Sequence, residues 1–154
     1  MKSIEQLTSD QLKNIKLLAF DSDGVLVKKG TELSQTKDGH FSQKANFVDP
    51  KVLDKLDQLK KHYEIIINSG RSAWYLSDIY RDVLDEKVTL ISEIGAFITG
   101  NGYHLPTSPL TLYEQQTIRT IRQKLNQLIG DPRVKGFEPK MFLTTLHCYQ
   151  SVDL

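Results

Sequence analysis

The feature that most constrains the fold is a short apolar run that ends in two acidic residues. Residues 15–20 are almost continuously apolar, and Asp21-Ser22-Asp23-Gly24 follows them directly. A run of this length that stops at a turn is typical of a buried strand. Gly24 supplies the backbone freedom that a tight turn requires. The two carboxylates therefore lie at the C-terminal end of a strand, where open α/β sheets bind their ligands.

Helix and strand signals alternate through the rest of the first hundred residues. Asp49-Pro50 is a favourable helix start, because Asp caps the first turn and Pro suits the first helical position. The expected elements, in order, are a helix over 50–61, a strand over 63–67, a helix over 74–84 and a strand over 88–91. This order predicts an α/β fold, Rossmann-like, with right-handed crossovers and a mainly parallel sheet. Residues 28–48 are polar and predict a loop or an irregular hairpin.

The second part of the chain predicts a separate unit. Residues 100–109 are rich in Gly, Pro, Asn and Ser, which favours a linker and a domain boundary. We therefore divide the chain into a core domain over 1–104 and the start of a second domain over 105–154. A helix is expected from Leu112 until Gly130 terminates it, and a strand over 141–149.

Composition excludes several classes of function. Twenty basic and nineteen acidic residues nearly cancel, and no segment concentrates Lys and Arg, so we expect no nucleic-acid partner. No apolar run approaches the ~20 residues that span a bilayer, so we expect no membrane partner. The single cysteine excludes an intrachain disulfide and favours a reducing compartment. We expect a cytoplasmic protein.

Paired carboxylates at a strand end suit phosphoryl transfer. One carboxylate can attack phosphorus when a divalent cation offsets the repulsion between the anions, and the second can donate a proton to the leaving oxygen. Two acidic residues and a glycine after a strand are, on their own, equally typical of a solvated turn. The surrounding residues have to separate these two interpretations.

Residues 17–26, Leu-Leu-Ala-Phe-Asp-Ser-Asp-Gly-Val-Leu, closely resemble the first motif of the haloacid dehalogenase (HAD) superfamily of phosphatases. The resemblance implies that Asp21 is the nucleophile, that Asp23 is the general acid/base, and that both hold Mg²⁺. Residues 65–71 resemble the second motif, which implies phosphate binding by Ser69, Gly70 and Arg71. We therefore expect these residues to meet at one edge of the sheet.

Further segments resemble HAD members with a large α/β cap. Residues 90–96 are similar to the segment before that cap, except that Ile94 stands where Asn is usual. Residues 137–140 and 146–149 resemble a cap strand of trehalose-phosphate and mannosyl-phosphoglycerate phosphatases, which implies that Glu138 and Lys140 hold a sugar phosphate. A surface salt bridge between Glu138 and Lys140 is the alternative.

Two HAD elements are not recognised in the sequence: the Lys of the third motif and the acidic pair of the fourth. Because both normally follow the cap, we expect the sequence to end within the cap. We also expect the chain on its own to hydrolyse phosphomonoesters slowly. The first strand would then have one free edge. We expect that edge to pair with residues 141–149 or with another copy, giving a homodimer or a strand-swapped assembly.

The function expected is Mg²⁺-dependent hydrolysis of a sugar phosphate or a similar small phosphorylated metabolite through an aspartyl-phosphate. A phosphomutase is a close variant. An uncapped enzyme resembling KDO 8-phosphate phosphatase ranks lower, because that group carries a Lys soon after the third strand and none follows here before Lys124. The non-enzymatic alternative is a HAD-like phosphate-binding or scaffold protein that lacks the distal Lys and acids.

Overall fold

The computed structural model describes residues 6, 8, 10, 13–28, 32–35, 41–44, 47–100, 103–106 and 109–149. Its largest element is a five-stranded sheet. The strands, in spatial order, are β1 (Leu17–Asp21), β4 (Glu64–Asn68), β5 (Val88–Ser92), β6 (Phe97–Gly100) and β7 (Tyr103–Pro106). β1, β4 and β5 are parallel, whereas β6 and β7 are antiparallel to their neighbours. The predicted α/β class and its first three strands are confirmed.

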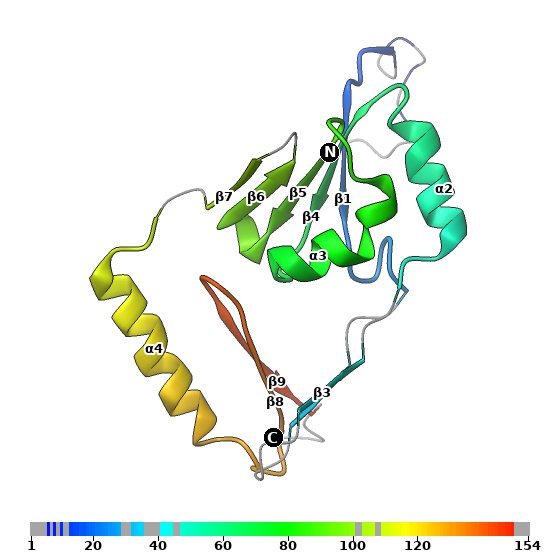
Figure 1. Cartoon of the computed structure of the whole chain (residues 1–154). Helices are drawn as coiled ribbons and strands as arrows, with labels where there is room; N and C mark the ends of the chain where they lie inside the picture. The colour runs from blue at the N-terminus through cyan, green and yellow to red at the C-terminus, as the bar shows by residue number, and fades with distance from the viewer. Residues whose placement is uncertain are drawn as a thin grey trace.

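Two helices connect the parallel strands. α2 (Pro50–Leu59) joins β1 to β4, and α3 (Ala73–Ile79), followed by the 3₁₀ turn η2 (Arg81–Val83), joins β4 to β5. The Asp49 side chain accepts a hydrogen bond from the Lys51 N–H at 2.9 Å, as expected of an N-cap. Both connections step across the sheet in the same direction, so right-handed crossovers put both helices over the same face (Figure 1).

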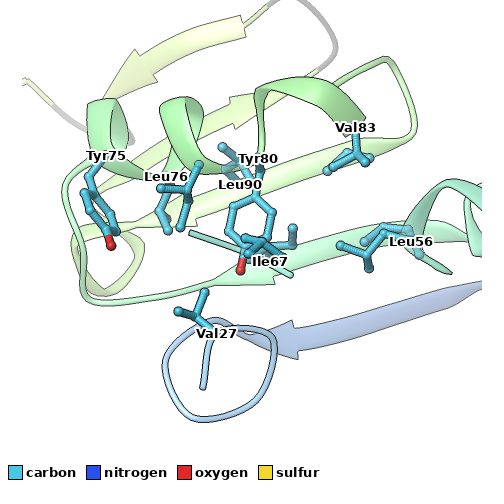
Figure 2. Packing of buried hydrophobic residues seen from close by; sticks show 12 residues of the cluster. Val27, Leu56, Ile67, Tyr75, Leu76, Tyr80, Val83 and Leu90 are labelled. Atoms are coloured by element: carbon cyan, nitrogen blue, oxygen red, sulfur yellow. The ribbon is translucent and has the colours of Figure 1, made fainter. Parts of the chain in front are cut away.

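The hydrophobic core lies between that face and the helices. Alternate residues of the strands, Ile65 and Ile67 on β4 and Leu90 on β5, are at most 1% exposed. They pack against residues of the helical layer such as Leu76 and Tyr80 (Figure 2). Residues of the opposite sheet face are more open, because Leu17 is 48% and Ile98 is 38% exposed.

The segment expected to be a linker contains a strand. Tyr103–Pro106 pairs with β6 as an antiparallel hairpin, so the expectation of a linker over 100–109 is wrong in this part. A proline is tolerated in β7 because β7 is an edge strand. β7 spans residues 104 and 105, between which the sequence predicts the domain boundary. The division into a core and a second domain stays a prediction.

The remaining elements lie on the side of the sheet's carboxyl edge (Figure 1). α4 (Leu112–Asn126) is followed by the antiparallel hairpin of β8 (Val134–Pro139) and β9 (Thr144–Cys148). We call residues 109–149 the cap segment. A second hairpin, β2 (Glu32–Gln35) with β3 (Phe41–Lys44), contacts β8, where the Phe137 N–H donates to the Gln35 side chain at 3.3 Å.

β9 does not cover the edge of β1. It pairs with β8 in a separate two-stranded sheet, and β1 pairs only with β4 among the described residues. The expectation that residues 141–149 would pair with β1 is therefore wrong, because the antiparallel partner next to them in sequence takes those backbone groups. Pairing with another copy stays a prediction. Within the same described ranges, no helix is long and apolar enough to cross a membrane.

Candidate active site

The two aspartates of the first motif lie where β1 ends. Asp21 is the last residue of the strand, and its side chain accepts a hydrogen bond from the Ser22 N–H at 2.7 Å. The chain then turns tightly, with the Ser22 carbonyl accepting from the N–H groups of Leu26 and Val27 at 3.0 and 2.9 Å. Gly24 has φ of +82°, a conformation that favours glycine. The turn leaves Asp21 exposed and Asp23 partly exposed.

Ser22, between the aspartates, points in the opposite direction. It is fully buried, and its hydroxyl lies 2.8 Å from the Tyr80 hydroxyl at the end of α3. Burial raises the pKa of Tyr80 to about 12, although the hydrogen bond with Ser22 acts the other way. Tyr80 thus anchors Ser22, in the middle of the turn over residues 21–24, to the core; we call these residues the aspartate turn. The sequence shows no sign of this contact, because the residues are 58 positions apart.

The second motif reaches the same edge of the sheet. Asp21 is opposite Asn68 in the parallel register, so Ser69 follows at the level where the β1 chain turns. The expected meeting of Asp21, Asp23 and Ser69 at one carboxyl edge is confirmed. Their chemical roles stay predictions.

The loop after β4 is held through its carbonyl groups. The Gly70 carbonyl accepts from Lys140 Nζ at 2.7 Å, and the Arg71 carbonyl accepts from the Glu93 N–H at 2.9 Å. The Ser69 hydroxyl accepts from the Arg71 N–H at 3.3 Å. The Gly70 N–H has no acceptor among the residues that the structure describes. Carbonyls that are fixed elsewhere keep a loop available to bind an anion through hydroxyl and N–H groups.

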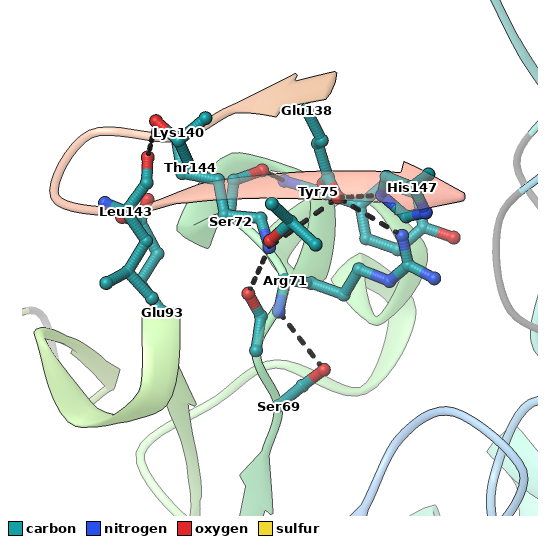
Figure 3. Close-up of polar contacts among 12 residues, drawn as sticks. Ser69, Arg71, Ser72, Tyr75, Glu93, Glu138, Lys140, Leu143, Thr144 and His147 are labelled. Carbon is teal, nitrogen blue, oxygen red and sulfur yellow. Dashed lines mark hydrogen bonds and ion pairs between the residues drawn. The ribbon is translucent and has the colours of Figure 1, made fainter. Parts of the chain in front are cut away.

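A network of charged groups joins the aspartate turn to the cap segment, and Figure 3 shows its part around Arg71, Glu138, Lys140 and His147. Arg71 Nε donates to Asp23 at 2.8 Å, and Arg71 Nη1 lies 3.5 Å from Glu138. Lys140 Nζ and His147 Nε2 lie 3.5 and 3.3 Å from the same Glu138 oxygen. Arg71, Glu138 and Lys140 are each less than 10% exposed. The structure thus brings Glu138 and Lys140 to Arg71. Glu138 and Lys140 form the ion pair of the alternative interpretation, but the pair is buried and not on the surface, and a role of the two residues in holding a sugar phosphate stays a prediction.

Neighbouring charges favour the ionised forms of Arg71 and Glu138. Burial opposes the charge on Arg71, but the hydrogen bond and charge of Asp23, with the charge of Glu138, raise its pKa. Burial also opposes the charge on Glu138, but the hydrogen bond from His147 and the charges of Lys140 and Arg71 hold its pKa below the ordinary value. A buried charge is tolerated when it is paired and hydrogen-bonded in this way.

The connection between β5 and β6 has an unusual backbone. Glu93 and Ile94, in the 3₁₀ turn η3 (Glu93–Gly95), have φ of 51° and 58°, in the left-handed region. A β-branched residue is costly there, whereas Asn adopts this conformation more readily. Ile94 is 79% exposed, and Glu93 is 2% exposed. The backbone at Ile94 would thus suit an Asn better than it suits Ile.

The acidic groups fit a magnesium ion in their chemistry. Mg²⁺ binds proteins through one or two carboxylates and fills its remaining positions with water and substrate oxygens. Asp21 and Asp23 supply two carboxylates at one sheet edge. The described residues contain no group of three or more acidic, His or Cys side chains suited to a metal.

Comparison with known proteins gave matches among solved structures only; neither models of protein families nor curated proteins match the sequence. The C-terminal domain of C. albicans trehalose-6-phosphate phosphatase matches with a TM-score of 0.62 and 22% identity, over 87% of this chain and 42% of that one. A trehalose-6-phosphate phosphatase related protein matches with a TM-score of 0.54 and 19% identity, over 81% and 48%. An IMP-nucleotidase of Plasmodium falciparum matches with a TM-score of 0.50 and 13% identity, over 88% and 40%. The chain spans less than half the length of each.

Proposed function

We propose that this chain, which has the fold of the HAD-type phosphatases, carries the nucleophile of a phosphomonoester hydrolase and its phosphate-binding loop, residues 69–71. The main support for this proposal is the position of three side chains. The ends of two adjacent parallel strands bring Asp21 and Asp23 to the same edge as Ser69, in the order and spacing that the resemblance predicts. A solvated turn would not require the second strand end to carry a hydroxyl and an anion-binding loop.

The reaction follows from the two carboxylates. An oxygen of Asp21 attacks phosphorus as the bond to the leaving oxygen breaks, and a protonated Asp23 gives its proton to that oxygen. Water then attacks the phosphorus of the aspartyl-phosphate while Asp23 takes a proton from it. Inorganic phosphate leaves, and Asp21 returns to its free form. A phosphomutase would differ only in the second step, where bound sugar replaces water.

Arg71 is placed to respond to the substrate. It holds Asp23 at 2.8 Å in this structure, and a guanidinium binds a phosphate dianion with the same fork of donors. An arriving phosphate group therefore competes with Asp23 for Arg71 and frees the carboxyl group for proton transfer. The Ser69 hydroxyl and the Gly70 N–H donate to the remaining phosphoryl oxygens.

Mg²⁺ is the cofactor that we assign to Asp21 and Asp23, where the Asp21 carboxylate would hold it throughout and the Asp23 carboxylate only while that group is ionised. When it is bound, its charge offsets the repulsion between the carboxylates and the phosphate. We place the rest of the substrate against Glu138 and Lys140, whose carboxylate and ammonium groups suit the hydroxyls of a sugar. Two of the matching structures are named for trehalose-6-phosphate phosphatase, which supports a sugar phosphate. We also propose a cytoplasmic location, which the single cysteine favours.

The test is phosphate release from an aryl phosphate and from a panel of sugar phosphates, with and without Mg²⁺. We expect Asp21→Asn to abolish release, because the amide keeps the shape and removes the attacking charge. Asp54→Asn is the control, because Asp54 is exposed on α2. Activity retained by Asp21→Asn within about tenfold, roughly 1.4 kcal/mol of barrier, would refute the assignment. Binding of phosphate with no turnover in the unmodified protein would favour the phosphate-binding alternative.

A further inference from the structure

We infer that Glu93 is a positioning residue that docks the tip of the β8–β9 hairpin onto the phosphate-binding loop, and so sets the place of Glu138 and Lys140 over the site. The inference rests on the proposed function for its catalytic meaning. The docking itself depends only on the contacts of Glu93.

The side chain of Glu93 holds the hairpin tip by its backbone. Its Oε1 accepts from the Met141 N–H at 2.9 Å, and its Oε2 accepts from the N–H groups of Phe142 and Leu143 at 2.7 and 3.2 Å. Three successive N–H groups on one carboxylate form an anion-binding arrangement, and hydrogen bonds to a charged acceptor are stronger than those between neutral groups. At the same tip, the Phe142 ring lies 6.3 Å from the ring of Phe97.

The backbone of Glu93 holds the phosphate-binding loop. Its N–H donates to the Arg71 carbonyl at 2.9 Å, while its side chain reaches the hairpin. Lys140, next to the tip, donates to the Gly70 carbonyl at 2.7 Å. Glu93 therefore contacts the hairpin tip and the phosphate-binding loop at once and fixes the distance between them. Its left-handed φ of 51° points to a conformation that the surroundings maintain.

Within the cap segment, α4 holds the hairpin tip independently of Glu93. The folding of the cap segment can therefore be distinguished from its docking onto the core. Arg122 on α4 donates to the carbonyl groups of Lys140 and Leu143, and to the Thr144 hydroxyl at 3.1 Å. The cap segment thus binds the tip through its carbonyls, and Glu93 of the core binds it through its N–H groups. In Glu93→Gln an NH2 donor replaces one carboxylate oxygen, so at least one of these N–H groups faces another donor while the cap is docked, whereas water satisfies it when the cap is not docked.

The first experiment measures docking without using activity. Nitroxide labels are placed on Cys148, the single cysteine and exposed, and on Lys61→Cys, exposed after α2, and their separation is measured by pulsed electron paramagnetic resonance. We expect one narrow distance in the unmodified background and a broad, longer distribution in Glu93→Gln. Glu86→Gln is the control, because it removes the same charge from an exposed turn of the core. Identical distributions for Glu93→Gln and the control would overturn the inference.

Two further measurements guard against a folding defect. In the unmodified protein, hydrogen exchange of the amides of residues 141–143 should be slow although Met141 is 61% exposed. Exchange at the rate of an open loop would overturn the inference without any variant. In turnover, Glu93→Gln should raise KM for a sugar phosphate by about tenfold or more and leave that for a small aryl phosphate unchanged. An equal effect on both substrates would also overturn it. Absence of any turnover would refute the proposed function and leave the distance measurement to decide docking.

Discussion

Replacing Ile94 by Asn should stabilise the protein, because it relieves an unfavourable backbone conformation at little cost in burial. Ile94 has φ of 58°, and a left-handed conformation costs a residue with a Cβ roughly 1–2 kcal/mol. Asn adopts it more cheaply because its side chain bonds locally. The loss of apolar burial is small, since the side chain is 79% exposed and a fully buried Ile is worth only about 1.5–3 kcal/mol. A gain of about 1 kcal/mol remains.

The assay is urea unfolding, with thermal unfolding as a second measure. A gain of about 1 kcal/mol corresponds to a rise in Tm of roughly 2–4 °C for a chain of this size. Ile94→Gly relieves the same strain but adds freedom to the unfolded chain, so its gain should be smaller. Val25→Asn is the control, because Val25 is 61% exposed on a turn with ordinary φ. Unfolding of Ile94→Asn at the same or a lower urea concentration than the unmodified protein would refute the strain argument.

Three more predictions concern single groups. One of the six tyrosines should ionise near pH 12 in an ultraviolet titration of the folded protein, and Tyr80→Phe should remove that step. Folding lowers the pKa of Glu138. Its ionised carboxylate therefore stabilises the fold above roughly pH 4.3, the ordinary pKa of Glu, and this stabilisation is lost as the pH falls below that value. Glu138→Gln should lose less free energy of unfolding in acid than the unmodified protein does. Light scattering after size exclusion should find a dimer that Leu17→Lys at the exposed edge strand converts to monomer, and a monomeric unmodified protein would contradict the edge-pairing proposal.

The parallel part of the sheet could be predicted because its signals are local. The apolar run before Asp21 and the run before Ser69 each stop at a turn, and alternation with helices fixes which edge the two stops share. β7 was missed because Gly, Pro and Asn occur both in linkers and in hairpin connections. Composition alone does not distinguish a linker from a hairpin connection when the second strand pairs with a strand fewer than about ten residues before it.

The contacts that bind the cap segment to the core could not be predicted from the sequence. Glu93 contacts backbone N–H groups, which carry no residue-specific signal, 48 to 50 positions away. Tyr80 and Ser22 are ordinary residues in their own segments and become a pair only in three dimensions. Glu138 and Lys140 were identified only through resemblance, and their burial beside Arg71 emerged from the fold.

The central claim is that Asp21 becomes phosphorylated, and the most direct test is to trap that intermediate. With an aryl phosphate, whose phenolate leaves without a proton from Asp23, Asp23→Asn should form the aspartyl-phosphate and hydrolyse it slowly, because the group that activates water is missing. The protein is mixed with a phosphomonoester and Mg²⁺, quenched in acid and digested, and its peptides are analysed by mass spectrometry. We expect one phosphoryl group on Asp21, removable by hydroxylamine and absent from Asp21→Asn. A phosphoryl group on Ser69, or turnover with no phosphorylated peptide in any variant, would contradict it.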